Sequence, residues 1–190
     1  IYFGRYTGKT PVSGSVTTAK TSSLRNELRG IDNDANSVAQ RPDAARFFQN
    51  LDGSEMWSRW DMQDAPPDIL VTNYSMLNIM LMRAIDAPIF DQTRQWLEAD
   101  NTNVLHLVID ELHTYRGTAG TEVAYLLRAL YKRLGITPDS PQLRIIASSA
   151  SLTDDDSGLD FLEGFFGRDR NRFRVIPGDI AVPDVSAVQQ

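Results

Sequence analysis

The run Val104-Leu105-His106-Leu107-Val108-Ile109 is followed directly by Asp110-Glu111. The run is almost entirely aliphatic and shows no polar alternation, which is typical of a strand in a parallel sheet that helices cover on both faces. Open α/β sheets bind their ligands at the carboxyl ends of such strands, where the two carboxylates stand. This stretch therefore predicts an α/β fold and the position of a site.

Strand and helix patterns alternate along the rest of the chain. We predict strands at residues 1–6, 68–73, 104–110 and 143–148, and the clearest helix at about residues 118–134, where Gly135 ends it. Strands that alternate with helices predict right-handed β-α-β units with a mainly parallel sheet in a three-layer α/β sandwich.

Residues 11–67 read as an insertion between two strands. Ser, Thr, Asn, Asp and Gln dominate its first half, which has little apolar surface, so we expect that half to be flexible. Aromatic residues gather in its second half, where we expect a short helix that packs Trp57 and Trp60 onto the core rather than offering them to bases. Residues 177–190 follow several breakers and predict a linker or tail.

Composition limits the function classes. The 190 residues, 42% of them hydrophobic, suffice for one substantial core, and no apolar run reaches the length of about 18 residues that spans a bilayer. A soluble cytoplasmic protein without a membrane partner is therefore expected. The net charge of −6 offers no bulk attraction to polyphosphate, so contact with nucleic acid needs a local patch. The absence of cysteine excludes disulfides, thiolate metal sites and a cysteine nucleophile.

The carboxylate pair suits phosphoryl transfer, which needs one carboxylate near Mg²⁺ and a second that orients the attacking water. We assign the first role to Asp110, acting through the water shell of the metal, and the second to Glu111. The alternative is that both carboxylates only cap the following helix, because acidic side chains favour helix N-termini.

Three stretches in order resemble helicase motifs. Asp110-Glu111-Leu112-His113 resembles the D-E-x-H motif II of superfamily-two DEAD/DEAH-box helicases, and Ser149-Ala150-Ser151 is similar to their S-A-T motif III. Thr72-Asn73-Tyr74 is similar to the turn of motif Ib. The resemblance implies that motif III couples hydrolysis to strand separation, and that the motif Ib turn contacts the nucleic-acid backbone. For Thr72 and Asn73 the alternative is a helix N-cap.

The flanks narrow the resemblance. His113-Thr114-Tyr115-Arg116-Gly117 looks like the H-x-Y-R-G stretch of MrfA-type DNA repair helicases and their DrmA-like phage-defence relatives. The resemblance implies a RecA-like first lobe of a P-loop NTPase over residues 1–176. It also implies ATP and Mg²⁺ as cofactors, with Mg²⁺ at Asp110 and Glu111, and DNA or RNA as partner. His113 would link the ATP state to a second lobe.

Gly8-Lys9-Thr10 imitates the end of a phosphate-binding loop, but Phe3 stands where the first glycine is required. We therefore predict a tight turn after a strand, and motif I is absent from this sequence. The start at Ile1, inside a predicted strand, leads us to expect a fragment whose upstream sequence supplies motif I, and which is inactive in isolation. A whole protein that has lost motif I is the alternative.

Two other functions stay open. One is a non-catalytic RecA-like module that binds nucleic acid or protein and keeps a vestigial acidic motif. The other is a metal-dependent nuclease, which is weaker because no further carboxylate completes a two-metal pattern. Arg168, Arg170, Arg172 and Arg174 alternate along a possible strand, which would put all four on one face as a phosphate-tracking strip; we favour the alternative that they form a solvated surface. We expect Asp154-Asp155-Asp156 to form a loop, and His106 to face the core.

Overall fold

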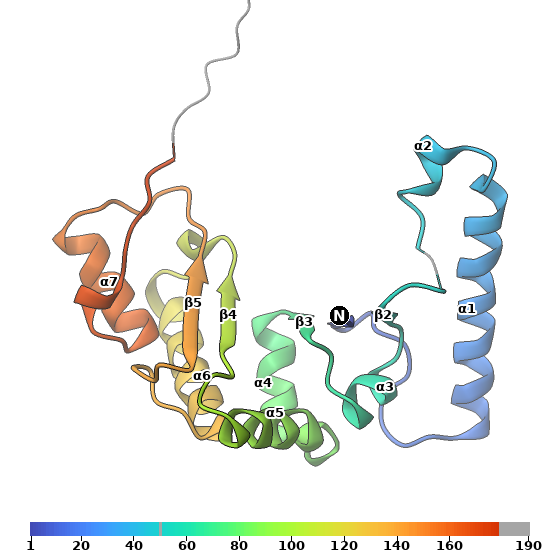
Figure 1. The fold of residues 1–190 in the computed structure, drawn as a ribbon, viewed down its shortest axis with the longest axis horizontal. Coiled ribbons are helices and arrows are strands. Elements are labelled where there is room, and N and C mark those ends of the chain that lie inside the picture. The colour runs from blue at the N-terminus through green and yellow to red at the C-terminus, as the bar shows by residue number, and fades with distance from the viewer. Residues whose placement is uncertain (50, 179–190) are drawn as a thin grey trace, which may run out of the picture. The chain divides into compact units, whose positions relative to one another are not determined.

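The computed structural model describes residues 1–49 and 51–178 (Figure 1). The chain divides into two compact units. The first contains Ile1–Asn103 and Ala129–Ile136, and the second contains Val104–Arg128 and the residues from Thr137 onward. The tail predicted at 177–190 lies outside the described residues except for its first two. No helix in the described ranges is long and apolar enough to cross a membrane.

The described elements follow the predicted alternation. The strands are β1 Phe3–Tyr6, β2 Glu55–Met56, β3 Ile69–Thr72, β4 Leu105–Ile109 and β5 Leu143–Ala147. The α-helices are α1 Thr18–Val38, α2 Pro42–Ala45, α3 Arg59–Asp64, α4 Tyr74–Met82, α5 Ala87–Ala99, α6 Gly117–Leu134 and α7 Asp156–Phe166. Short 3-10 helices are η1 Ala84–Asp86, η2 Leu112–Thr114 and η3 Arg170–Arg172. All four predicted strands and the predicted helix that ends before Gly135 are confirmed.

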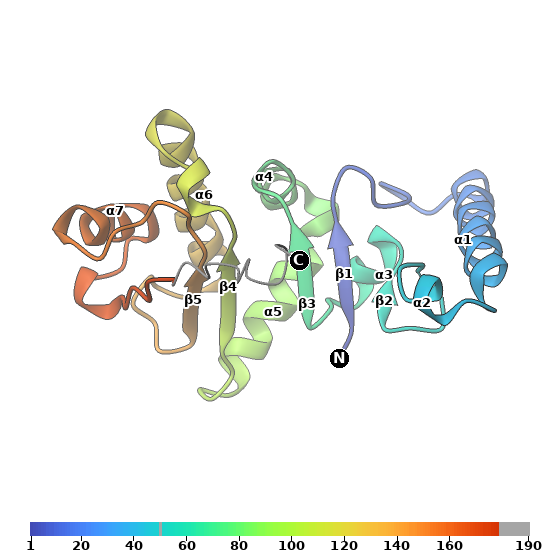
Figure 2. The same ribbon diagram turned by 90° about the horizontal axis from the view of Figure 1, so that it is seen from above.

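The strand pairing is parallel throughout the described chain. In the first unit β1 lies between β2 and β3, and in the second unit β4 pairs with β5, as Figure 2 shows. The predicted α/β class with parallel pairing is therefore confirmed. The strands form two hydrogen-bonded sheets, because only neighbours within each unit are paired.

One face of each sheet is exposed, which differs from the predicted burial on both faces. In the second unit the register pairs His106 with Arg144 and Val108 with Ile146, so the four side chains share a face. Val108 is 64% exposed and Ile146 is 54% exposed. The prediction that His106 faces the core is wrong, because its side chain points to this open face.

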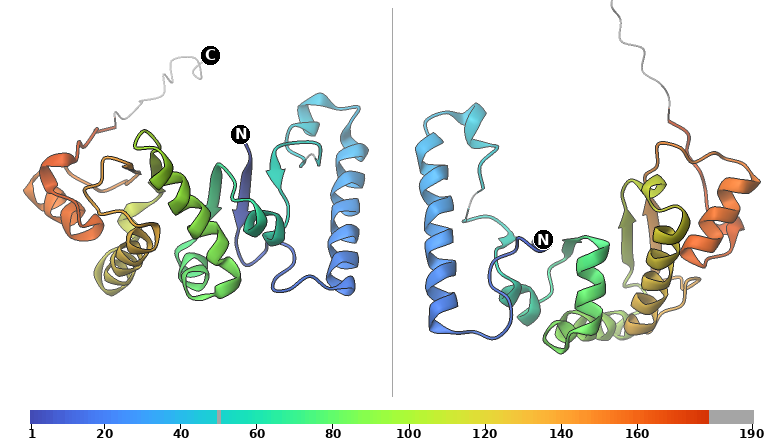
Figure 3. Two further views of the ribbon diagram at one scale, coloured as in Figure 1. Left: turned by 60° about the horizontal axis from the view of Figure 1, so that its bottom comes forward. Right: turned by 180° about the vertical axis from the view of Figure 1, so that it is seen from behind.

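Helix α1 corrects the expectation of a flexible first half of the insertion. It runs unbroken over 21 residues (Figure 3), and the side chain of Thr17 caps its start by accepting a hydrogen bond from the Lys20 amide. Only Val38 of this helix is buried. The prediction failed because it considered apolar surface alone. Residues 18–38 contain no proline and only one glycine, so nothing in them interrupts a helix.

The second half of the insertion packs a short helix, as predicted. Ser58 and Asp61 form a capping box at the start of α3, and Met62 of this helix is fully buried. A Cβ on Gly4 of β1 would come within 2.3 Å of the Met62 sulfur, so the glycine allows the helix to approach the strand. Trp60 is half-buried and donates its indole N–H to the Gly14 carbonyl over 2.6 Å.

A buried polar cluster joins β1, α3 and η1 within the first unit. The Tyr6 hydroxyl donates to Asp86, and the Gln63 amide donates to the same carboxylate oxygen over 2.7 Å and to the Tyr6 oxygen over 2.8 Å. Tyr6 and Asp86 are both completely inaccessible, and Arg83 pairs with Asp86 over 3.4 Å. The hydrogen bonds to Oδ1 of Asp86 offset part of the cost of burying these groups, while among the described residues Oδ2 has only the ion-pair contact with Arg83.

Alkaline titration tests this cluster. Burial, reinforced by the Asp86 carboxylate, raises the pKa of Tyr6 from 10.0 to about 12. The stability that the protonated phenol contributes is therefore complete below pH 10 and is lost as the pH rises towards about 12. We expect urea midpoints, followed by circular dichroism, to fall between pH 9 and pH 12 by more in the wild type than in Tyr6→Phe. The exposed control Tyr2→Phe should behave as the wild type, and an identical pH response in all three proteins would contradict this assignment.

Candidate functional site

The site at the carboxyl edge of the second unit begins where β4 ends. Asp110 follows the last residue of this strand, and its carboxylate is exposed. Glu111 adopts a left-handed backbone conformation with φ 54° and ψ 44°. A non-glycine residue pays about 1–2 kcal/mol for this conformation, and such strain concentrates at functional sites. The backbone thus turns sharply between the two carboxylates.

Ser148, the first residue after β5, holds this turn in place. Its hydroxyl donates to Oδ1 of Asp110 and accepts the Glu111 amide N–H over 3.1 Å. Its backbone accepts the Leu112 amide over 2.8 Å and donates to the Ile109 carbonyl over 3.0 Å. Since the register pairs Ile109 with Ala147, Asp110 and Ser148 occupy the next positions of neighbouring parallel strands. The sheet itself therefore brings them together.

The helix-capping alternative for the carboxylates does not match the structure. Helix α6 begins only at Gly117, and η2, which starts directly after Glu111, has no side-chain cap. The Glu111 side chain is 64% exposed. The pair is therefore held at the strand end by β5 and is left open to solvent.

His113 meets the loop after β5 through one ring nitrogen. Its Nδ1 lies 3.3 Å from the Ala150 amide nitrogen and 3.3 Å from Oε2 of Glu111. Nδ1 accepts from Ala150 only when it carries no proton, and it donates to Glu111 only when it does. The position of one proton thus decides whether His113 binds the loop or the carboxylate.

Ser151 contacts Arg116, which lies three residues after His113. Nη2 of Arg116 lies 3.3 Å from the Ser151 hydroxyl and 3.4 Å from its carbonyl oxygen. The hydroxyl of Ser149 accepts from the Ser151 amide over 3.4 Å, so it contacts its own loop instead of the acidic pair. Of the predicted coupling residues, Ala150 contacts His113 in the Asp110–His113 stretch, and Ser151 contacts Arg116, which follows that stretch.

Thr72, Asn73 and Tyr74 lie in the first unit, at the end of β3 and the start of α4. Asn73 caps this helix by accepting the Met76 amide over 2.9 Å, and the Thr72 hydroxyl donates to the Tyr6 carbonyl over 2.7 Å. The N-cap alternative is thus what the structure shows for Asn73. The Tyr74 ring is 48% exposed.

Gly8-Lys9-Thr10 forms the predicted tight turn after β1. The Thr10 amide donates to the Thr7 carbonyl over 3.2 Å, and the Thr10 hydroxyl accepts the Thr7 amide over 2.8 Å. The turn closes on itself and leaves no cradle of amides pointing outward. No phosphate-binding loop is formed there.

The arginines from Arg168 to Arg174 do not form the predicted strand. Arg168 is buried and donates to the carbonyls of the 138–143 loop, and Arg170 pairs with Asp156 and Asp160 of α7. Arg172 binds Asp139 over 3.4 Å. The phosphate-tracking strip, which was the less favoured reading, is not formed, because intramolecular acceptors bind Arg168, Arg170 and Arg172. The favoured solvated surface does not hold for Arg168, which is buried.

The acidic run 154–156 serves helix α7. Asp155 caps the helix by accepting the Gly158 amide over 2.8 Å, and this backbone donor, with the Thr153 hydroxyl, holds the pKa of Asp155 below its usual range. Asp156 lies in the first turn and pairs with Arg170. The expected loop therefore ends at a helix cap.

The donors at the acidic pair fit a magnesium nucleotide better than a protein-only metal cage. Within the described ranges no three His, Asp or Glu side chains gather into a metal cluster. Mg²⁺ commonly binds through one or two carboxylates together with substrate phosphates and water. Asp110 offers such a carboxylate at an exposed strand end, and its Oδ1 is already oriented by Ser148.

Ser148 and Arg116 were not singled out from the sequence as site residues. Ser148 stands one position before the recognised S-A-S triplet, and only the register of β5 against β4 reveals its partner. Arg116 lies in the H-x-Y-R-G stretch, which was a signal for it, but its partner Ser151 is distant in sequence.

Comparison with known proteins gives one long relative. The Druantia protein DruE of Escherichia coli (strain UMEA 4076-1) is 44% identical to this chain over 136 residues. The aligned part is 70% of this chain and 7% of the relative, so the chain matches a small part of that protein's length. No family model matches the chain, and no solved structure matches it.

Removing the Ser148 hydroxyl tests the geometry of the site. We expect Ser148→Ala to accelerate hydrogen exchange at the Glu111 amide roughly fivefold, because a hydrogen bond contributes about 1 kcal/mol. Ser149→Ala is the matched control, since its hydroxyl does not contact the acidic pair. Exchange followed by NMR should separate the two variants. Equal exchange at Glu111 in both would show that Ser148 does not hold this turn.

Proposed function

We propose that this chain is part of an ATP-dependent DNA helicase or translocase of superfamily two, in which it forms part of the first RecA-like lobe. The observation that carries the proposal is the hydroxyl of Ser148, which bonds the carboxylate of Asp110 and the amide of Glu111 together at a strand end. The similarity to one part of a much longer Druantia protein supports a role within a larger polypeptide.

In the proposed enzyme, Asp110 and Glu111 have different roles at the nucleotide. Bound Mg-ATP would supply the phosphoryl group and the cation that neutralises its charge. Asp110, held by Ser148, would hold the cation through its water shell. Glu111, whose side chain is 64% exposed, would orient and polarise the attacking water.

The loop after β5 supports coupling between the nucleotide and the nucleic acid. Ala150 contacts His113, and Ser151 contacts Arg116. A displacement of the turn at Asp110 and Glu111 would therefore be transmitted to this loop. In the proposed enzyme His113 passes the nucleotide state to a second lobe, and Ser149 belongs to the same loop. Thr72, Asn73 and Tyr74 would contact the phosphate backbone, since helix N-termini favour anions.

The missing motif I favours a second candidate, a non-catalytic module with a vestigial acidic motif. Phosphoryl transfer requires a phosphate cradle, and the sequence of this chain contains none. In the helicase that we propose, another part of the protein supplies the cradle and the second lobe. Hydrolysis in the longer protein distinguishes the two candidates.

Substitution of Glu111 tests catalysis. In the longer protein that contains this chain, we expect Glu111→Gln to retain Mg-ATP binding and to lose at least about a hundredfold in hydrolysis rate, which is the scale of general-base catalysis. Phosphate release measures the rate, and binding of a fluorescent ATP analogue measures the affinity. Glu122→Gln, an exposed change on α6, serves as control. Normal hydrolysis by Glu111→Gln would contradict the role of Glu111.

The 190-residue chain alone provides a second test. Without a phosphate cradle we expect no measurable heat when Mg-ATP is titrated into it at submillimolar concentration. Calorimetry at two temperatures guards against a binding enthalpy that happens to be near zero. Micromolar affinity would show that this chain binds the nucleotide by itself and would overturn our account of the absent loop.

A further inference from the structure

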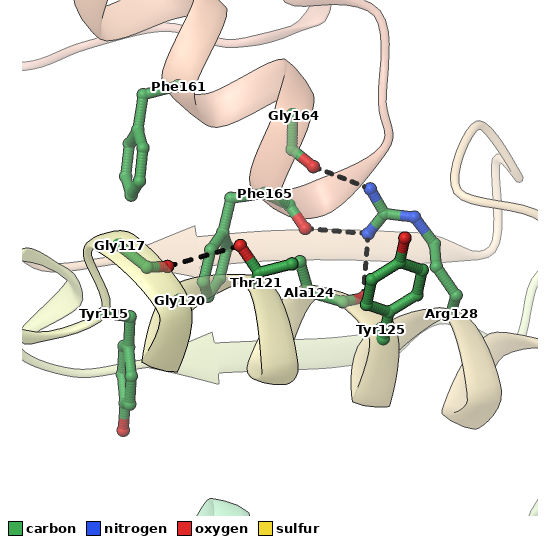
Figure 4. A pocket seen from close by; sticks show the side chains of 10 residues that line it. All are labelled: Tyr115, Gly117, Gly120, Thr121, Ala124, Tyr125, Arg128, Phe161, Gly164 and Phe165. Atoms are coloured by element: carbon green, nitrogen blue, oxygen red, sulfur yellow. Dashed lines mark hydrogen bonds between the residues drawn. The ribbon is translucent and has the colours of Figure 1, made fainter.

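A pocket lies in the second unit between the N-terminal half of α6 and the C-terminal half of α7 (Figure 4). Its volume is about 570 Å³ and ten residues line it. Small-molecule sites commonly have volumes of about 300–1,000 Å³. The proposed chemistry at Asp110 and Glu111 uses none of these ten residues.

Aromatic rings form much of the pocket wall. Tyr115 and Phe165 stack with ring centroids 6.1 Å apart, and Phe161 lies 5.7 Å from Phe165. Tyr125 is 73% exposed, so its ring is reachable from solvent. Phe165 is only 4% exposed, so the rings that remain open to another planar group are those of Tyr125 and, in part, Phe161.

The charge of the pocket is opposite to that of the whole chain. The chain carries a net charge of −6, yet Arg128 is the one charged residue among the ten and none is acidic. The carbonyls of Ala124, Gly164 and Phe165 hold the Arg128 guanidinium in place, as the dashed lines of Figure 4 show. Arg116 adds a second guanidinium 5.7 Å from the centre of the Phe161 ring.

Gly164 lines the pocket without being required by the fold. A Cβ at this position would meet no atom within 4 Å, so neither packing nor a special backbone angle requires glycine there. Gly120, by contrast, is needed by the fold, because its Cβ would lie 2.3 Å from the Tyr115 carbonyl oxygen. Glycine inside a helix costs about 1 kcal/mol relative to alanine.

We infer that this pocket binds an unpaired base of a single-stranded nucleic acid, whose phosphates face Arg116. A nucleobase is planar and stacks on aromatic rings whatever its sequence, and the attached phosphates are attracted by guanidinium groups. A base in a duplex is already stacked and cannot enter. The inference rests on the proposed function for the class of ligand, and it adds a contact point for that ligand.

The position of Arg116 gives this contact a connection to the site. The same guanidinium lies over Phe161 of the pocket and donates to Ser151 in the loop after β5. A base that enters beside Phe161 therefore contacts the ring that supports Arg116. The pocket places the strand next to the loop that also touches His113.

Cross-linking locates the base directly. The full 190-residue chain is mixed with oligothymidylate that carries one 5-iodouracil, without ATP, and is irradiated and digested with trypsin. Residues 117–128 and 145–168 are then separate peptides, because cleavage follows Arg116, Arg128, Arg144 and Arg168. We expect the base on Tyr125 or Phe161, the more exposed rings of the pocket. Attachment only within 60–83, which contains Tyr74, would overturn the pocket and leave the proposed strand contact at β3 intact.

Two variants measure the pocket's contribution to binding. Gly164→Leu adds a large side chain at a lining position where a Cβ meets no atom within 4 Å, and Tyr125→Ala removes an exposed ring. Fluorescence anisotropy with labelled oligothymidylate should show a loss of affinity of roughly tenfold for each, since one stacked base contributes about 1–3 kcal/mol. The controls are Gly30→Leu, another open helical glycine, and Tyr2→Ala, another exposed tyrosine; both should bind as the wild type.

Competition distinguishes the ligands. Unlabelled single strand should displace the probe, whereas a blunt duplex and free thymidine monophosphate at equal nucleotide concentration should not. Unchanged affinity in both pocket variants, or no binding of the single strand to the wild type, would overturn the inference. No step of this experiment uses ATP, so its outcome does not depend on hydrolysis by the longer protein. Failure of the pocket and failure of the proposed function can therefore be distinguished.

Discussion

The parallel pairing of β4 with β5 is the constraint on which the candidate site depends. Parallel strands end at the same edge, so the residue after each strand meets its counterpart. Here those residues are Asp110 and Ser148, and the hydroxyl of the second orients both the carboxylate of the first and the amide of Glu111. The left-handed turn at Glu111 is stabilised by the same hydroxyl. Without this register the carboxylates would be two mobile side chains on a loop.

Electrostatics in this chain is local rather than global. An acidic chain repels nucleic acid on average, but its arginines differ in whether a carboxylate neutralises them. Arg170 and Arg172 are paired with carboxylates, whereas Arg116 contacts only a serine and an aromatic ring among the described contacts. A charge that is not neutralised by a carboxylate attracts phosphate more strongly. The count of arginines in a segment is therefore a poor guide to where an anion would bind.

Much of the fold followed from local pattern. The aliphatic runs at β3, β4 and β5 and the periodic helix before Gly135 were predictable, because their signals lie within a few neighbouring residues. The exposure of His106 and Val108 was not, since a strand sequence does not tell which of its faces a helix covers. Helix α1 was missed because its polar composition resembles that of a flexible segment, while its cap at Thr17 and its lack of breakers favour a helix.

The sequence by itself determined the strand ends and the carboxylates and hydroxyls placed there, because the order of apolar and polar residues is local information. It also determined that no phosphate-binding loop occurs in this chain, since glycine spacing is read directly. Only the tertiary structure decided that Ser148 is the partner of Asp110 and that Arg170 forms ion pairs with Asp156 and Asp160. It also decided that aromatic rings of α6 and α7 line one pocket. These depend on register and helix packing, which join residues far apart in the chain and leave no local trace.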